Sequence, residues 1–188
     1  MMMENDLRRE IADVCHLLHV KNFVAATDGN VSARLRDGNI LCTPNNMSKG
    51  LVRPEDLLVV DMQGQPVGPR YGPARLLKPT SEIRLHLEAY KQRPDIRAVV
   101  HAHPPVAIAL SIAGVSLARC LLPEVIVTLG LIPTLPYAFP ASEESAALIT
   151  EPIKRYDALM LERHGSVTVG SSPMEAYLKL EKVEHTAQ

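Results

Sequence analysis

Two histidines separated by one residue, His101 and His103, have the spacing that most directly suggests chemistry. They lie in the run AVVHAHPP, which predicts a short apolar strand closed by Pro104 and Pro105. Residues i and i+2 of a strand share one face, about 6–7 Å apart, so both imidazoles could reach one metal ion. Taken alone, the pair could also be two histidines of a strand with no shared function.

A third histidine strengthens the metal hypothesis. His164 follows an apolar run and precedes Gly165. Three imidazoles leave one coordination position open, as catalytic zinc sites do, although manganese or cobalt also suit such a site. Taken alone, His164 could be a capping or core residue. The remaining histidines lie on predicted helices, and we interpret them as surface or packing residues: His16, His19, His86 and His185.

One carboxylate stands close to these histidines along the chain. Glu82 lies near the start of the helix that precedes the His-Ala-His strand. It could be a fourth metal ligand or a general acid–base group. The alternative is an ordinary first-turn acid, which stabilises a helix by roughly a few tenths of a kcal/mol. His86, four residues after Glu82, could also lie near the site.

Several polar residues could hold an anion. Thr80 and Ser81 are suitable N-caps of the same helix, and free N–H groups at a helix N-terminus bind phosphate. The loop of Thr27, Gly29 and Asn30 and the loop that begins at Asn45 and Asn46 add further donors. Such loops are also ordinary turns, so each one alone is weak support.

The elements that would position these residues alternate between hairpin-linked strands and helices. Helices are expected over residues 4–20, 80–93, 106–114, 142–156 and 172–188. Strands are expected over 31–35, 39–44, 57–60, 98–105, once or twice within 124–138, and as a strand-turn-strand over 158–170. The pattern predicts an α/β protein with helices on both faces of a mixed, largely antiparallel sheet.

Length and composition set the class of protein. A chain of 188 residues favours a single domain over 1–188. The formal net charge of −1 gives no global field that would attract nucleic acid or an anionic membrane. Cys15, Cys42 and Cys120 are interpreted as free thiols in a reducing compartment. The N-terminus has no signal-peptide pattern and no segment could span a bilayer, so we expect a cytoplasmic protein.

Six segments in order resemble the class II aldolase/adducin family. They are TDGNVSARL (27–35), TPNNMSKG (43–50), PTSE (79–82), AVVHAHPP (98–105), LPEVIVTLG (122–130) and ERHGSVTVG (162–170). The resemblance covers nearly the whole chain. It implies a three-layer α/β/α fold, and a homotetramer with active sites between neighbouring subunits. Members that resemble adducin lack the metal histidines, whereas this sequence keeps all three.

The resemblance also implies a reaction. The family's zinc ligands match His101, His103 and His164, and its catalytic carboxylate matches Glu82. Its phosphate-binding positions match Asn30, Thr80 and Ser81, with Thr27, Asn45 and Asn46 nearby. The implied activity is that of an aldehyde-lyase of the L-fuculose-1-phosphate aldolase type. Such an enzyme cleaves a phosphorylated ketose to dihydroxyacetone phosphate and an aldehyde, with Glu82 transferring the proton.

The sequence departs from this pattern in three places. Fuculose-type aldolases have a tyrosine near the position of Cys120, and their phosphate loop has a glycine where Asn46 stands. They also have a C-terminal tail with a second tyrosine, which we expect to be missing after Gln188; Tyr137 or Tyr71 could substitute. Epimerisation, dehydration or decarboxylation of a related sugar phosphate therefore remains an alternative. A non-catalytic adducin-like interaction module is another.

Overall fold

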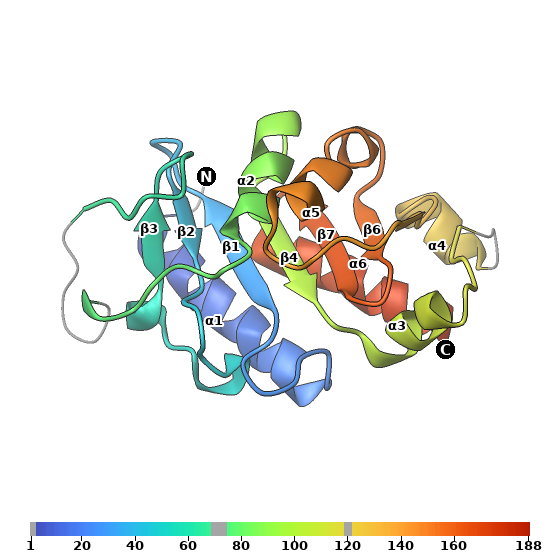
Figure 1. Ribbon diagram of the computed structural model, residues 1–188. Coiled ribbons are helices and arrows are strands. Elements are labelled where there is room, and N and C mark those ends of the chain that lie inside the picture. The colour runs from blue at the N-terminus through green and yellow to red at the C-terminus, as the bar shows by residue number, and fades with distance from the viewer. Residues whose placement is uncertain (1–2, 69–74, 119–121) are drawn as a thin grey trace.

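The strand β4 (Ala98–Ala102) lies at the centre of the sheet, and all five of its residues are buried. The computed structural model describes residues 3–68, 75–118 and 122–188, and places β4 fourth in a seven-stranded sheet (Figure 1). The order is β3-β2-β1-β4-β7-β6-β5, and only the pair β5–β6 is parallel. The other strands are β1 (Asn30–Arg34), β2 (Ile40–Cys42), β3 (Leu58–Val60), β5 (Thr134–Leu135), β6 (Ala158–Leu161) and β7 (Gly165–Gly170).

Helices cover both faces of this sheet, which confirms the predicted three-layer α/β/α class. On one face, α1 (Glu4–Val20) and α6 (Pro173–Ala187) share a core with β1 and β4. On the other face, α2 (Ile83–Gln92) packs against the sheet, with α5 (Glu143–Leu148) beside it. The remaining helices are α3 (Pro105–Ile112), α4 (Pro123–Thr128) and the 3₁₀ helices η1 (Lys49–Leu51), η2 (Pro54–Asp56) and η4 (Pro152–Lys154).

Strand alternation decides which side chains meet α2. In β1, Val31 and Ala33 join the core beneath α1 and α6. The alternate residues Ser32 and Arg34 contact α2 instead. In β4, Val99 packs in the core on the α2 side, so His101 shares that face. The face of the sheet beneath α2 therefore contains the polar residues of both strands.

Most of the predicted elements are confirmed, including the hairpin at Asp37-Gly38 and the first and last helices. Two predicted caps are also confirmed. The hydroxyl of Ser142 accepts a hydrogen bond from Ser145 N–H, and that of Ser172 accepts one from Glu175 N–H. Helix α5 is shorter than predicted, because it ends at Leu148 and η4 follows.

The strands predicted within 124–138 are partly wrong, because a helix, α4, forms first and only the short strand β5 follows. The β-branched run of this segment favours a strand by propensity. Tertiary contacts override that preference, since Val125 and Leu129, four residues apart, are buried while Val127 is exposed. Pro123 starts the helix and Gly130, with φ +75°, follows it.

The predicted start of the second helix is also wrong. Helix α2 begins at Ile83 with Glu82 as its N-cap residue, so neither Thr80 nor Ser81 caps it. The Thr80 hydroxyl instead accepts a hydrogen bond from Glu82 N–H at 3.4 Å, and Thr80 N–H donates to the Thr43 carbonyl. Glu82 is therefore placed at the N-terminus itself, before the first helical turn.

The described cysteines are free thiols, as predicted. Cys15 and Cys42 are buried, and burial raises the pKa of each thiol to about 12. Cys120 lies outside the described residues. Among those residues, we find no helix that combines the length and apolar character needed to cross a membrane.

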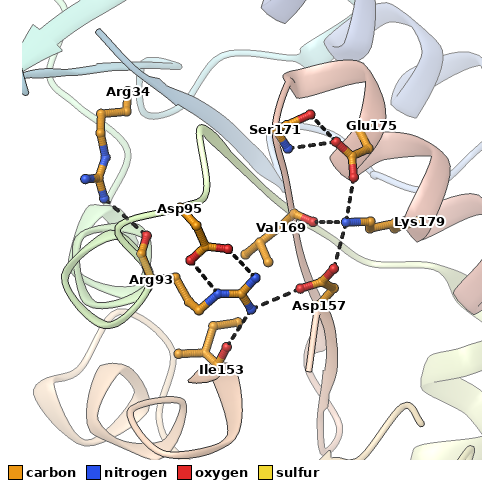
Figure 2. A network of polar contacts seen from close by, with 9 residues as sticks. All are labelled: Arg34, Arg93, Asp95, Ile153, Asp157, Val169, Ser171, Glu175 and Lys179. Carbon is orange, nitrogen blue, oxygen red and sulfur yellow. Dashed lines mark hydrogen bonds and ion pairs between the residues drawn. The ribbon is translucent and has the colours of Figure 1, made fainter. Parts of the chain in front are cut away.

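A network of ion pairs joins several elements at the strand ends opposite the histidines (Figure 2). Arg93, after α2, donates to both carboxylate oxygens of Asp95 at 2.8 and 2.7 Å and to Asp157 at 3.0 Å. Lys179 of α6 donates to Asp157 at 2.9 Å and pairs with Glu175 at 2.9 Å. The network therefore links α2, β4, β6 and α6.

We expect Arg93→Ala to lower the free energy of unfolding by about 1–2 kcal/mol, because it removes several charge-assisted hydrogen bonds of a half-buried group. Urea denaturation measures this change. Lys91→Ala is the control, since Lys91 is exposed and its nearest carboxylate oxygen lies 3.9 Å away. Equal stability of the two variants would show that the network contributes little.

Candidate metal centre and anion pocket

Three imidazoles converge where β4 ends and β7 begins. His101 lies on β4, His103 follows that strand, and His164 lies in the turn between β6 and β7. The antiparallel pairing of β4 with β7 sets Ala102 opposite Ser166, which brings His164 beside the other two. One ring nitrogen of each histidine lies within 4.8 Å of the other two, so the cluster could hold a metal ion.

The outer ring nitrogens have acceptors that orient the rings. His101 Nδ1 donates to the Ser166 carbonyl at 2.9 Å, which leaves the Nε2 lone pair facing the cluster. His103 Nδ1 lies 3.4 Å from an Asp28 carboxylate oxygen. Acceptors of this kind are typical of metal-binding imidazoles. Asp28 was predicted only as part of a turn, and nothing in the sequence indicated that its loop meets His103.

The ring nitrogens that point into the cluster are close enough to one another and to Glu82 to require a positive charge between them. His101 Nε2 lies 3.2 Å from His103 Nε2 and 3.0 Å from Glu82 Oε2. Two lone pairs and a carboxylate oxygen repel one another at such distances unless a proton or a cation lies among them. Burial opposes a charge on His101, yet the facing Glu82 carboxylate raises the pKa of His101 above its ordinary value.

Glu82 has one satisfied and one unsatisfied oxygen. Oε2 accepts a hydrogen bond from Asn30 Nδ2 at 3.0 Å. Oε1 is buried, lies 3.2 Å from His164 Nε2, and has no hydrogen-bond partner in the described part of the chain. Buried acceptors of this kind normally have a partner. The donor set of three imidazoles and one unpaired carboxylate oxygen therefore fits a divalent cation.

The pKa values of Glu82 and His103 are both shifted by their neighbours in the centre. Burial disfavours ionisation of Glu82, but His101 and then His164 hold the pKa of its carboxyl below the ordinary range. Burial, and then the neighbouring imidazoles of His101 and His164, lower the pKa of His103 to about 3. The neutral form of His103 is the one that binds metals.

Gly165 allows the histidines to approach. A Cβ at this position would lie 2.5 Å from the Ala102 carbonyl oxygen and 2.8 Å from His103 Cδ2. Neither distance is compatible with a side chain, since the nearer atom belongs to the backbone. The glycine after His164 is therefore required by packing at the centre itself.

A pocket of about 330 Å³ opens directly onto the metal centre. Glu82, His103 and His164 form part of its wall. All six residues predicted to bind an anion line the same pocket: Thr27, Asn30, Asn45, Asn46, Thr80 and Ser81. No lysine or arginine of the described chain lines it, so an anion would be held by hydroxyl, amide and backbone N–H groups.

The asparagine at the glycine position of the family's phosphate loop has a structural explanation. Asn46 has φ +55°, in the left-handed region that glycine adopts at no steric cost. Asparagine is among the residues that tolerate this region best. The loop therefore keeps the backbone shape that a glycine would give it.

Lys49 is a second residue whose role the sequence does not reveal, because a lysine in a polar loop is ordinarily exposed. The side chain is buried, and its Nζ donates to the Thr27 carbonyl at 2.8 Å and the Met47 carbonyl at 2.6 Å. It thereby ties together the two loops that line the pocket.

No tyrosine lines the described part of the pocket. Tyr137 lies under the guanidinium of Arg163, 4.9 Å from ring centroid to Cζ, and does not reach the pocket wall. Tyr71 and Cys120, the other positions considered for this role, lie outside the described residues.

Comparisons with known proteins identify the family of this chain. A sequence profile described as Class II Aldolase and Adducin N-terminal domain matches residues 9–188. The chain belongs to the class II aldolase/adducin family. The resemblance noted from the sequence motifs is thus confirmed.

Relatives within the class II aldolase/adducin family have more than one activity. An L-fuculose phosphate aldolase of Methanococcus vannielii is 34% identical over 96% of this chain and 93% of its own. A 3-oxo-tetronate 4-phosphate decarboxylase of Escherichia coli O6:H1 is 30% identical over 99% of this chain and 86% of its own. The crystal structure of YgbL from Klebsiella pneumoniae, described as a candidate aldolase/epimerase/decarboxylase, has a TM-score of 0.89 and 32% identity. It covers 100% of this chain and 89% of that one.

We expect His103→Ala to lose bound metal together with any metal-dependent activity, because two imidazoles make a weaker site. Metal content after dialysis and isothermal titration with Zn²⁺ measure the loss. His185→Ala is the matched control, since His185 is exposed on α6. Unchanged metal retention by the His103 variant would contradict the proposed ligand set.

Proposed function

We propose that this chain is a metal-dependent lyase that breaks a carbon–carbon bond of a small phosphorylated sugar or sugar acid. The first candidate reaction is aldol cleavage of a phosphorylated ketose resembling L-fuculose 1-phosphate, which gives dihydroxyacetone phosphate and an aldehyde. The observation that supports it is the shared wall of the metal centre and the anion pocket. A substrate phosphate in the pocket would set the neighbouring carbons beside the histidines and Glu82.

In this proposal His101, His103 and His164 hold the metal. Imidazole donors favour zinc, and manganese or cobalt would also be accepted. When bound, such a cation polarises a carbonyl oxygen and stabilises the negative charge that develops as the adjacent carbon–carbon bond breaks. The Ser166 carbonyl and Asp28 keep the imidazoles of His101 and His103 oriented for this purpose.

The proton is carried by Glu82. In aldol cleavage, the hydroxyl oxygen on the carbon that becomes the aldehyde loses its proton as the carbon–carbon bond breaks. A proton is then delivered to the carbon of the phosphate-bearing fragment that has lost that bond. Glu82 lines the pocket and its Oε1 has no hydrogen-bond partner in the described chain, so we assign to this oxygen the taking and returning of that proton.

The phosphate would be bound by neutral donors. The pocket has the backbone before α2, with Thr80 and Ser81, on one side and the Asn45-Asn46 loop on the other. Backbone N–H groups and the positive end of a helix dipole favour an anion without a cationic side chain. Lys49 supports this arrangement, because its Nζ donates to carbonyls of both the Thr27 loop and the loop that follows Asn46.

A second candidate reaction is decarboxylation of a phosphorylated 3-oxo acid. The described pocket wall has two carboxylates, Glu82 and Asp28, and Asp28 lies beside the outer ring nitrogen of His103, which leaves Glu82 as the one acid–base group in this proposal. A carboxylate group leaves as carbon dioxide with no proton transfer at the leaving group, so one acid–base group meets all the needs of that reaction. An aldol cleavage uses Glu82 twice or requires a second group.

We further propose a homotetramer, as the family resemblance implies, located in the cytoplasm, as expected from the pattern of the N-terminus. Phe139 is 71% exposed and directly precedes Pro140 and Ala141, which line the pocket. In the proposed tetramer, a neighbouring subunit would cover this ring. Light scattering of the purified protein tests the assembly.

Two substrate assays distinguish the candidate reactions. The zinc-loaded protein is incubated with dihydroxyacetone phosphate and a panel of aldehydes, and separately with 3-oxo-tetronate 4-phosphates. We expect a new carbon–carbon bond in the first assay and no carbon dioxide in the second. Carbon dioxide release alone would identify the decarboxylase. A chelator should abolish either activity, and added Zn²⁺ should restore it. Failure of both assays would overturn the proposed function.

Glu82→Gln should reduce turnover by about 10²–10⁴-fold, because it removes the general acid–base group. The variant should keep the fold and much of the metal, since the three imidazoles remain. Steady-state kinetics and metal content measure the two effects separately. Full activity in this variant would remove Glu82 from the mechanism.

A further inference from the structure

Two rows of polar side chains face each other between β1 and α2. Side chains on one face of a strand recur every two residues, which is a rise of about 6.6 Å. Side chains on one face of a helix recur about every four residues, which is a rise of about 6.0 Å, so the two spacings nearly match. Each strand residue therefore stands beside a helix residue, beginning at the metal centre. The strand row is Asn30, Ser32 and Arg34, and the helix row is Glu82, the N-cap residue of α2, followed by His86 and Tyr90.

Hydrogen bonds join these rows into a continuous chain, which we call the polar ladder. Asn30 Nδ2 donates to Glu82 Oε2 at 3.0 Å, and Asn30 Oδ1 lies 2.5 Å from His86 Nε2. His86 Nδ1 lies 2.7 Å from the Ser32 hydroxyl, which lies 2.8 Å from the Tyr90 hydroxyl. All five side chains are buried, and His86 is fully so.

The chemistry of each group fixes the direction of every proton in the polar ladder. The Glu82 carboxylate only accepts, so the Asn30 amide must turn its NH₂ to Glu82 and its oxygen to His86. That oxygen only accepts, so His86 must carry its proton on Nε2. The neutral ring then accepts at Nδ1 from Ser32, whose own oxygen accepts from Tyr90.

We propose that His86 is a positioning residue for Glu82, acting through Asn30. His86 holds the Asn30 amide in one of its two orientations, and that orientation places an N–H donor on Glu82 Oε2. Without the His86 donor, the amide could rotate and turn its oxygen toward the carboxylate, where two acceptors would repel. This assignment rests on the proposed function only for the meaning of Glu82 in turnover; the orientation of the amide does not depend on it.

The orientation of the Asn30 amide makes the two carboxylate oxygens of Glu82 differ. Oε2 accepts a hydrogen bond from Asn30 and lies 3.0 Å from His101 Nε2, whereas Oε1 lies 3.2 Å from His164 Nε2 and has no hydrogen-bond partner in the described chain. The polar ladder thus keeps one oxygen fixed and leaves the other for the metal or the substrate proton. Packing alone does not explain a histidine at this position. An apolar side chain could fill the buried space between α2 and the sheet without the cost of burying two polar ring nitrogens.

Two substitutions of similar polarity separate the two hydrogen bonds of His86. In His86→Gln, the side-chain NH₂ replaces Nε2–H and can still donate to Asn30. In His86→Asn, the shorter amide reaches only as far as Nδ1, so it can accept from Ser32 but cannot reach Asn30. We expect His86→Asn to lower kcat by about 10–100-fold with little change in KM, and His86→Gln to stay within about 5-fold of the wild type.

The same substitutions at His185, which is exposed on α6, are the controls for a general effect of losing a histidine. Thermal denaturation shows whether each variant is folded. A loss of stability shared by both His86 variants, with equal kcat in the two, would mean a purely structural role and would overturn the proposal.

A spectroscopic measurement tests the polar ladder without any activity. In the full-length protein with ¹⁵N-labelled histidine, His86 should show a protonated Nε2 and an unprotonated Nδ1 from pH 6 to 8. The side-chain amide resonances of Asn30 should shift in His86→Asn more than in His86→Gln. A proton on Nδ1, or an unchanged Asn30 amide, would refute the assignment. Failure of the substrate assays alone would refute only the proposed function.

Discussion

The pairing of β4 with β1 on one side and β7 on the other determines where every group of the candidate site lies. The β1 register sets Asn30 opposite His101, and the β7 register brings Gly165 and His164 against the end of β4. A shift of one residue in either pairing would turn the histidine face of β4 toward α1 and α6. The buried valines and alanines of β4, which fill the core on both faces, hold that register.

Because Glu82 and His101 are buried, the groups around them must supply the hydrogen-bond partners that water would otherwise provide. A buried carboxylate and a buried imidazole are unfavourable unless each polar atom has a partner. The Ser166 carbonyl pairs with the outer nitrogen of His101, and Asn30 and the polar ladder hold Glu82 Oε2, which leaves Glu82 Oε1 and the inward imidazole nitrogens facing one another. The ion pairs around Arg93 lie at the other ends of the same strands, so polar contacts join helices to the sheet at both ends of β4 (Figure 2).

The sequence predicted what local spacing determines. His101 and His103 were recognisable because a strand repeats every two residues, and the anion loops because their residue types are typical of turns and helix starts. Asp28, Lys49 and the polar ladder were not recognisable, since their roles depend on how β1 pairs and how α2 packs. The strands expected within 124–138 were partly wrong because burial of Val125 and Leu129 at helical spacing outweighed β propensity. The metal and phosphate roles themselves remain predictions.

Five described residues other than glycine have a positive φ, and four of them border the pocket or adjoin a residue that does. Asn46 and Ala141 line it, while Ala26 precedes Thr27 and Arg163 precedes His164. Alanine and arginine are strained in this region by roughly 1–2 kcal/mol each. The loops therefore store conformational energy that the sheet and Lys49 hold in place. For protein engineering, glycine at Ala26, Ala141 or Arg163 would relieve this strain and raise thermal stability. The more flexible loops would bind a ligand less tightly.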